Sequence, residues 1–415
     1  MLSDFFEAGW RIRALRQGPS GALLEGFADA LSDQRYATIT GRKHLRSAEH
    51  FIDWAGRHGL AVSGVNTEAL DRFACHVARC RCRYAHANRI EVLKGARIFA
   101  TYLRDAHVIA ASALDQEEVP DPILLAEFSA WMRQQRGTCA TTLANYGRPI
   151  RDMLRQLGET PSRWDVHQLR AFVLEKCRSS GWAAAKCCTT ALRMFLRFLI
   201  AGGHCAVGFE AAIPTVAHWR LSALPRYFQP AEVERVITSC DDTSPVGRRD
   251  RAILLLLARL GLRAGDIVQL RLNDIDWREA RIRVSGKSRR STHLPLSQEV
   301  GQAIVTYLQR GRPQTTSDAV FVTCRAPFRP FGSHCAISVI VDRALRRAGV
   351  TRPSRGAAHL LRHSLATSML REGGSLQDIG AVLRHRSIQT TQIYAKVDVT
   401  ALRSIAQPWP EVQPC

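Results

Sequence analysis

Apolar residues recur at spacings of three and four through most of the first two hundred positions, the pattern of helices that bury one face. An acidic, proline-containing stretch at 115–122 interrupts the pattern, and Gly202 and Gly203 end it as a helix C-terminal cap. The sequence therefore predicts two successive helical bundles. Their expected helices span 42–58, 67–81 and 87–105 in the first bundle, and 123–135, 141–157, 165–178 and 183–201 in the second.

The pattern changes after the second bundle. Residues 207–229 contain Pro214 and Pro225, are followed directly by Pro230 and show little periodicity, which is typical of a linker between domains. A helix is expected after Pro230, where a proline at the first helical position is favourable. The nearly continuous apolar run at 250–262 predicts a helix that is buried in the core of a further domain.

Two short strands are expected within this further domain. Residues 281–285 and 292–296 have strand-like composition, and the turn at 286–290 would join them into a hairpin with a basic tip. Helical spacing returns afterwards. Ser375, with Asp378 three residues later, indicates the start of one of these helices through a capping-box arrangement.

Together these elements predict a multidomain, mainly α protein that ends in a mixed α+β domain with a small antiparallel sheet. The length fits this prediction, because 415 residues exceed what a single core usually holds. The expected parts are an N-terminal helical domain at 1–115, a second helical domain at 120–206, the linker at 207–229, the mixed domain at 230–400 and a C-terminal tail at 401–415.

Charge indicates a partner. Lys and Arg number 58 against 37 Asp and Glu, a formal charge of +21. The excess is +2 over 1–120, +6 over 121–220 and +13 over 221–415, so a polyanion should meet the last two segments. The longest apolar run is too short to span a bilayer, and the N-terminus lacks a secretory pattern. We therefore expect no membrane contact and a cytoplasmic protein that acts at the nucleoid.

The 12 cysteines are interpreted as small buried apolar side chains rather than as disulfides. Cys75, Cys80, Cys82 and His86 have the ligand types of a zinc site, but their spacing differs from the paired patterns that zinc sites use. We interpret this group as a helix with incidental thiols and expect no bound metal.

Four segments late in the chain hold the chemically capable side chains. His359 and Arg362 stand three residues apart on an expected helix, so both project from one face. Arg263 follows a glycine that can direct its guanidinium into a cleft. Converging guanidinium and imidazole groups are costly without an anion, and phosphodiester oxygens suit bidentate arginine. The segments are 261–267 (Gly-Leu-Arg-Ala-Gly-Asp-Ile), Lys287 in the hairpin turn, 359–364 (His-Leu-Leu-Arg-His-Ser) and 383–394.

In this order the segments resemble the catalytic domain of the tyrosine recombinases, the phage integrase family, over roughly residues 225–399. The resemblance implies that Tyr394 is the nucleophile, which attacks the scissile phosphate to give a 3′-phosphotyrosyl link and a free 5′-hydroxyl. It further implies that Arg263 and Arg362 bind the non-bridging oxygens of that phosphate.

The resemblance also implies that His359 and His385 supply hydrogen bonds and handle protons, while Lys287 protonates the departing 5′-oxygen. An ordinary contact to a backbone phosphate is the alternative for Lys287. Two positions depart from the family pattern. Asp266, a supporting carboxylate, stands where Glu is common, and Arg384 stands where Gly eases a left-handed helix end.

Neither a metal nor another cofactor is implied for catalysis, because no acidic cluster accompanies these residues and the phosphotyrosyl link conserves the phosphoester energy. In the family, a helical core-binding domain and the catalytic domain close around double-stranded DNA, so 120–206 and 230–400 are expected to form that clamp. A solvated basic face is the alternative for the arginines concerned. The expected DNA contacts are Arg148, Arg151, Arg155, Arg193, Arg197, Arg289 and Arg290.

The resemblance predicts a site-specific recombinase or integrase of a mobile element, active in integration or transposition, that works as a homotetramer on two DNA sites. Two alternatives stay open: a type IB topoisomerase-like enzyme that relaxes DNA, and a non-catalytic DNA-binding partner of another recombinase. Accessory recombinases and host factors are further candidate partners. The weak charge of residues 1–115 favours contacts with other protomers over contacts with arm-site DNA.

Overall fold

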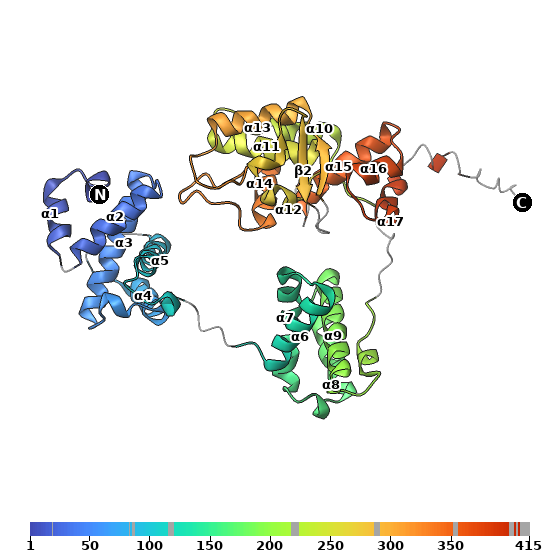
Figure 1. Ribbon diagram of the computed structural model, residues 1–415, viewed down its shortest axis with the longest axis horizontal. Coiled ribbons are helices and arrows are strands. Elements are labelled where there is room, and N and C mark those ends of the chain that lie inside the picture. The colour runs from blue at the N-terminus through green and yellow to red at the C-terminus, as the bar shows by residue number, and fades with distance from the viewer. Residues whose placement is uncertain are drawn as a thin grey trace, which may run out of the picture. The chain divides into compact units, whose positions relative to one another are not determined.

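Two compact units make up the protein, which is drawn as a ribbon in Figure 1. One unit comprises Met1–Ala113 together with Leu221–Cys415, and the other comprises Leu114–Arg220. The structure is a computed structural model. It describes residues 1–18, 20–82, 84, 88–114, 120–216, 224–285, 291–351, 356–397, 402–403 and 406.

In the residues described between 1 and 113, five α-helices form the N-terminal part of the first unit. Phe51 and Phe73 pack edge to face at its core, with ring centroids 5.0 Å apart. Helix α5 approaches α3 closely at Gly95, where a Cβ would lie 2.5 Å from the Cβ of Ser47. Asparagine side chains cap the starts of α4 and α5. The three helices predicted here are confirmed, and α1 and α2 precede them. The helices are α1 (Gly9–Gln17), α2 (Gly21–Asp33), α3 (Thr38–Arg57), α4 (Thr67–Arg79) and α5 (Arg89–Asp105).

Four α-helices lie in the described residues of the second unit, around a core that is rich in phenylalanine. Phe128 and Phe195 pack edge to face, with ring centroids 5.4 Å apart. Asp165 caps one helix by accepting hydrogen bonds from two backbone amides, and Gly203 follows the last helix with a left-handed φ of +73°. All four predicted helices are confirmed to within one residue at each end. They are α6 (Ile123–Arg136), α7 (Ala140–Leu157), α8 (Val166–Arg178) and α9 (Trp182–Ala201).

The C-terminal part of the first unit is built around α11 (Pro245–Arg259). Its residues from Ile253 to Leu257 have no exposed surface, which confirms the predicted buried helix. Apolar side chains from the neighbouring helices and from the sheet join the same core.

A three-stranded antiparallel sheet, ordered β1-β2-β3, lies in this part of the chain. The predicted hairpin is confirmed, with Arg281 opposite Pro295 and Ser285 opposite Ser291. Strand β1 was not predicted, because two residues are too few to show an alternating pattern. The hairpin turn at 286–290 lies outside the described residues, and so do Lys287, Arg289 and Arg290. The strands are β1 (Ile275–Asp276), β2 (Arg281–Ser285) and β3 (Ser291–Pro295).

Helices complete the chain after the sheet. The side chain of Ser375 accepts a hydrogen bond from the amide of Asp378 at 3.1 Å, which confirms the predicted capping box at the start of α16. The remaining helices of this part are α10 (Pro230–Thr238), α12 (Ala264–Gln269), α13 (Gln298–Arg310), α14 (His334–Arg347), α15 (Ala357–Arg371), α16 (Leu376–Val382), α17 (Ile388–Thr391) and the short 3-10 helix η7 (Gln392–Val397).

Two residues of the predicted linker pack onto a core, although Val207 at its start is 90% exposed. Ile213 is buried in the core of the second unit, and Phe228 is buried in the core around α11. The amide of Phe228 also donates to the hydroxyl of Ser364 at 2.8 Å. The domain boundaries expected from the sequence stay predictions. Among the described residues, no helix is both long enough and apolar enough to cross a bilayer.

Candidate active site

A left-handed turn after α11 places the first predicted site residue. Gly261 has a φ of +57°, and a Cβ at this position would come within 2.9 Å of Leu383 and 3.0 Å of Leu365. Glycine is therefore needed both for the backbone conformation and for the close approach of the side chains. The turn leaves Arg263 as the N-cap residue of α12.

Arg362 on α15 is held by the backbone of two other segments. Its side chain is buried, and its guanidinium donates to the carbonyl oxygens of Gly261 and Leu383. Burial first, and then the charges of Arg263 and Arg384, lower the pKa of Arg362 to about 9. The shift means that desolvation and repulsion from two like charges destabilise the charged form of this guanidinium. A bound anion would offset both effects.

Arg263 joins the same cluster. Its Nη2 lies 3.3 Å from the carbonyl oxygen of Arg384. Burial lowers the pKa of Arg263, and the charge of Arg384 acts in the same direction while Asp266 acts against it. The structure therefore brings together the two arginines for which the family resemblance implies phosphate binding.

Asp266 and Arg384, interpreted from the sequence as departures from the family pattern, form an ion pair with each other. One carboxylate oxygen of Asp266 also accepts the backbone amide of Arg263 at 2.9 Å. Arg384 has a φ of +52°, so it takes the left-handed conformation that glycine would adopt more easily. The Nε and Nη1 atoms of Arg384 are buried without a hydrogen-bond partner among the described residues.

Tyr394 lies in η7 with 1% of its surface exposed, and its hydroxyl is 2.6 Å from Nδ1 of His363. Burial raises the pKa of Tyr394 to about 12, although the nearby charge of Arg362 acts the other way. Burial, followed by the charges of His359 and Arg362, lowers the pKa of His363 to about 4. Both groups are therefore neutral at pH 7, and the tyrosine rests as a protonated phenol.

The two predicted catalytic histidines lie on different elements. Nδ1 of His385 is 2.8 Å from the hydroxyl oxygen of Thr391. Burial and the nearby arginines lower the pKa of His385 to about 4, so its imidazole is also neutral at pH 7. His359 is exposed on α15, and its ring centroid lies 6.2 Å from that of His363.

His363 was not among the predicted site residues. It stands next to Arg362 and four residues after His359, so its place on the same helix face was visible in the sequence. Its contact with Tyr394 was not visible, because that contact depends on how η7 folds back onto α15. The sequence signal is therefore the helical spacing from His359.

The arginines predicted to contact DNA from the second unit are held in different ways. Arg148 and Arg197 are exposed. Arg193 donates to the carbonyl oxygen of Ile213 at 3.0 Å, so it also holds part of the segment that follows α9. Arg155 is exposed as well, so Arg148, Arg155 and Arg197 are the exposed members of this set, while Arg151 and Arg193 are partly buried.

Two further members of the set are paired within the protein. Arg151 forms an ion pair with Asp121, with its Nε 3.0 Å from the carboxylate. Arg155 lies 3.1 Å from a carboxylate oxygen of Asp152. Part of their charge is thus compensated by neighbouring acidic groups.

A buried tyrosine hydroxyl beside an arginine cluster and neutral imidazoles defines a site suited to nucleophilic attack on a phosphodiester. Comparison with known proteins places this site in a family. The sequence pattern of the phage integrase family matches residues 226–400. The chain is 37% identical to an integrase/recombinase of Sinorhizobium fredii, y4rA, over 99% of each chain, and 28% identical to the tyrosine recombinase XerD of Lacticaseibacillus casei over 65% of this chain and 92% of that protein.

Solved structures support the same conclusion for the fold. A XerH site-specific recombinase in a post-cleavage complex with its difH substrate gives a TM-score of 0.56 at 17% identity, and covers 85% of this chain and 99% of that one. A lambda integrase dimer bound to a core site gives a TM-score of 0.53 at 18% identity, over 70% and 98%. The chain belongs to the tyrosine recombinases of the phage integrase family, DNA strand transferases that carry out site-specific recombination.

Proposed function

We propose that Tyr394 is the nucleophile of this recombinase and that Arg263 and Arg362 hold the scissile phosphate. The phenolic oxygen forms a bond to phosphorus as the bond from phosphorus to the 5′-oxygen breaks. The products are a 3′-phosphotyrosyl link and a free 5′-hydroxyl. The observation that carries this proposal is the buried cluster in which Arg362 lies near both Arg263 and Tyr394.

Proton transfer falls to the remaining predicted residues. The phenolic proton must leave Tyr394, and the 5′-oxygen must gain a proton. His359 and His385 supply hydrogen bonds and handle protons at the phosphate, and the neutral state of His385 at pH 7 suits this task. Lys287 donates the proton to the leaving 5′-oxygen, since its ammonium can release a proton at a pH at which a guanidinium cannot.

The nucleophile has to leave its resting place before it can react. Tyr394 is buried, and its hydroxyl is engaged by His363. We infer that DNA binding moves η7 so that the hydroxyl reaches the phosphate between the arginines. This step links cleavage to correct assembly on DNA, because the free protein keeps its phenol protonated and enclosed.

Double-stranded DNA is the proposed partner of the chain. Residues 120–206 form the core-binding domain and residues 230–400 the catalytic domain, joined by the linker at 207–229. Arg148, Arg151, Arg155, Arg193 and Arg197 contact the DNA backbone from the first domain, and Arg289 and Arg290 from the second.

The proposed assembly is a homotetramer on two DNA sites. Lambda integrase, which shares the fold with a TM-score of 0.53 at 15% identity, has been solved as a tetramer bound to a Holliday junction. Residues 1–115 contact other protomers in this assembly, and the tail at 401–415 docks on a neighbouring subunit. The reaction serves the integration or transposition of a mobile element in the bacterial cytoplasm, alone or with accessory recombinases.

Covalent trapping tests the proposal. The recognition site is first selected from random DNA, and a nicked substrate built on that site traps the cleaved complex for a denaturing gel. Tyr394→Phe removes only the phenolic oxygen, so DNA binding should stay within a few fold while the covalent adduct is lost. An adduct that persists in Tyr394→Phe would assign the nucleophile to another residue.

Tyr307→Phe is the matched control. Tyr307 is also fully buried, and its hydroxyl accepts a hydrogen bond from the amide of Val322 at 3.4 Å, away from the arginine cluster. This variant should keep the adduct. Relaxation of supercoiled DNA that lacks the selected site would favour the topoisomerase alternative, and no adduct from the unmodified protein would favour a non-catalytic partner.

A further inference from the structure

Four side chains with metal-ligand chemistry converge in the N-terminal helices. His50 comes from α3 and His76 from α4, while Cys80 and Cys82 follow the end of α4. Their ligand atoms all lie within 4.8 Å of one another. Of the part of the chain that the structure describes, this is the one group of at least three such side chains.

The three separations that involve His50 are close to those of a tetrahedral site. His50 Nε2 lies 3.1 Å from His76 Nε2, 3.3 Å from Cys82 Sγ and 3.6 Å from Cys80 Sγ. Zinc bonds of about 2.0–2.1 Å to nitrogen and 2.3 Å to sulfur place tetrahedral ligand atoms roughly 3.3–3.8 Å apart. The two sulfur atoms are closer, at 2.6 Å. A bound ion would increase their separation by about 1 Å.

We propose that His50, His76, Cys80 and Cys82 bind one zinc ion. Two imidazoles and two thiolates form a donor set that prefers zinc to magnesium or calcium, because those harder ions select oxygen ligands. With all four positions filled by protein, the site is of the structural kind rather than the catalytic kind. The proposal is independent of the recombination chemistry.

Surrounding aromatic rings hold the histidines in place. The ring of Tyr84 stacks on that of His50, with centroids 4.7 Å apart, and Phe73 packs against the same ring edge to face at 5.1 Å. His50 is 3% exposed, so its ring is fixed in the protein interior with Nε2 toward the other three ligands. Such packing lowers the entropy that the ligands lose when an ion binds.

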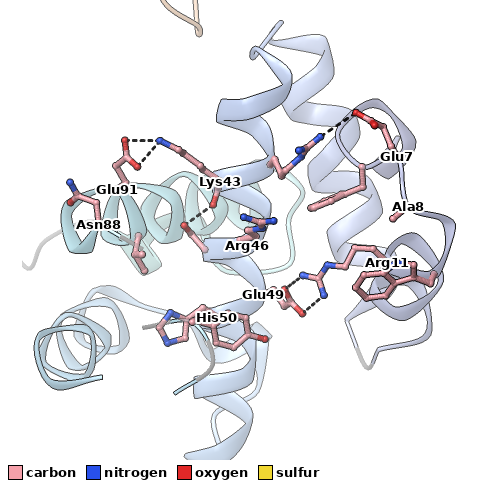
Figure 2. A pocket seen from close by; sticks show the side chains of 15 residues that line it. Glu7, Ala8, Arg11, Lys43, Arg46, Glu49, His50, Asn88 and Glu91 are labelled. Carbon is pink, nitrogen blue, oxygen red and sulfur yellow. Dashed lines mark hydrogen bonds and ion pairs between the residues drawn. The ribbon is translucent and has the colours of Figure 1, made fainter. Parts of the chain in front are cut away.

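A zinc ion would link the segment between α4 and α5, through Cys80 and Cys82, to His50 on α3. Figure 2 shows His50 on the same helix as Lys43, Arg46 and Glu49, which line a pocket in this part of the protein. Lys43 contacts Glu91 on α5 at 2.9 Å, so the ion and this pair would hold α3 to the segments after α4 at separate points. An ion in this place would therefore set how the N-terminal helices pack.

The zinc proposal departs from the sequence interpretation of incidental thiols. Cys80 and Cys82 do converge with histidines, but Cys75 is exposed and not part of the cluster, and His86 lies outside the described residues. His50 and His76 were both missed by the sequence interpretation. His50 is distant in sequence from the cysteines, and its approach depends on helix packing.

Metal analysis of the untagged full-length protein tests the proposal. Protein purified without chelator should contain one zinc ion per chain, as measured by elemental mass spectrometry. Replacement of the zinc by Co²⁺ should give the visible bands of a tetrahedral ion and the charge-transfer absorption of thiolate ligands. A protein that neither contains zinc nor takes up Co²⁺ with these bands would overturn the proposal, as would a disulfide between Cys80 and Cys82 under reducing conditions.

Variants then assign the ligands. Cys82→Ser should lower the zinc content at least tenfold and lower the melting temperature, whereas Cys75→Ser, in the same stretch of sequence, should retain one zinc per chain. Because Cys82→Ser could fail to fold, Co²⁺ spectra of His76→Cys provide a second measurement, in which the thiolate absorption increases. Equal zinc contents in Cys82→Ser and Cys75→Ser, or an unchanged spectrum in His76→Cys, would exclude this ligand set.

Discussion

At the scale of single residues, two departures from the family pattern compensate each other. Arg384 takes a left-handed conformation, which costs an ordinary side chain about 1–2 kcal/mol relative to glycine. Its guanidinium pairs with Asp266, and the same carboxylate holds the backbone of Arg263. Asp266 and Arg384 therefore act together to support Arg263, one of the proposed phosphate-binding residues.

A double-mutant cycle should reveal this coupling. Arg384→Gly relieves the backbone strain but leaves a buried carboxylate without its cation, and Asp266→Asn leaves a buried cation without its anion. We expect each single variant to lose about 2 kcal/mol or more of unfolding free energy, and the double variant to lose at least about 1 kcal/mol less than their sum. Chemical unfolding measures all four proteins. Additive losses would mean that the ion pair contributes nothing.

His363 should make the stability of the fold depend on acid. Its pKa is about 4 in the folded protein and near 6.5 in an unfolded chain, so the unfolded state binds more protons between these values. Stability is therefore lost as the pH falls through this window, by at most about 1.4 kcal/mol per pH unit for this one group. His363→Asn should flatten the fall between pH 6.5 and 4.5 relative to the unmodified protein. Parallel curves for the two proteins would exclude the effect.

The sequence was sufficient to predict which residues are catalytic candidates. It was not sufficient to predict the contacts that these residues make. Arg362 and Tyr394 stand in short local motifs whose order is recognisable. The contact between His363 and Tyr394 joins segments that are distant in sequence, and no spacing rule reports it. The pairing of Arg384 with Asp266 was invisible for the same reason, since it depends on a left-handed residue.

At the scale of elements, the long amphipathic helices and the hairpin were predictable because their burial patterns repeat. The four helices of the second unit begin and end within one residue of the prediction. Elements shorter than one pattern repeat were missed, and β1 is the example. Helices α1 and α2 precede the stretch in which the sequence predicted helices. Hydrophobic periodicity therefore predicts long helices and strands well. The turns that orient the site side chains depend on tertiary contacts, which periodicity does not report.

The turn between α11 and α12 is the element on which the arginine cluster depends. Gly261→Ala places a Cβ in the left-handed region and against Leu383 and Leu365, so we expect a loss of about 2 kcal/mol or more in unfolding free energy. Cleavage should fall too, because the carbonyl of Gly261 holds Arg362. Thermal or chemical unfolding and single-turnover cleavage measure the two effects.

Gly265→Ala is the matched control for this prediction. Gly265 lies four residues later on α12, and nothing stands within 4 Å of the Cβ that the substitution would add. Alanine also loses less entropy than glycine on entering a helix, so stability should stay the same or rise by up to about 1 kcal/mol. Equal losses in the two variants would show that the left-handed turn has no special role.

At the scale of the whole molecule, net charge and the cluster of histidines and cysteines lie in different parts of the chain. Residues 1–120 carry a net charge of only +2, whereas 121–220 carry +6 and 221–415 carry +13. The N-terminal helices instead contain the His and Cys cluster, which the other parts of the described chain lack. This distribution agrees with the proposal that the N-terminal helices contact other protomers and that the rest of the chain contacts DNA.

The salt dependence of DNA binding tests this division. Each phosphate contact that is lost should lower the slope of log K against log salt by about 0.9. Arg148 and Arg197 are exposed, whereas Arg151 is paired with a carboxylate and Arg193 is bound to a backbone carbonyl. Arg148→Ala combined with Arg197→Ala should therefore lower the slope by about 2 without loss of stability.

Arg16→Ala is the control from the N-terminal helices. Arg16 is half exposed and pairs with Glu25 at 2.6 Å, and it lies in the segment of low net charge. Its loss should leave the salt slope of DNA binding unchanged, because counterions are released only where protein cations replace them on phosphate. Binding isotherms at several salt concentrations give the slope for each protein. A slope that falls with Arg16→Ala and not with the Arg148 and Arg197 substitutions would move the DNA interface to the N-terminal helices, where the charge distribution argues against it.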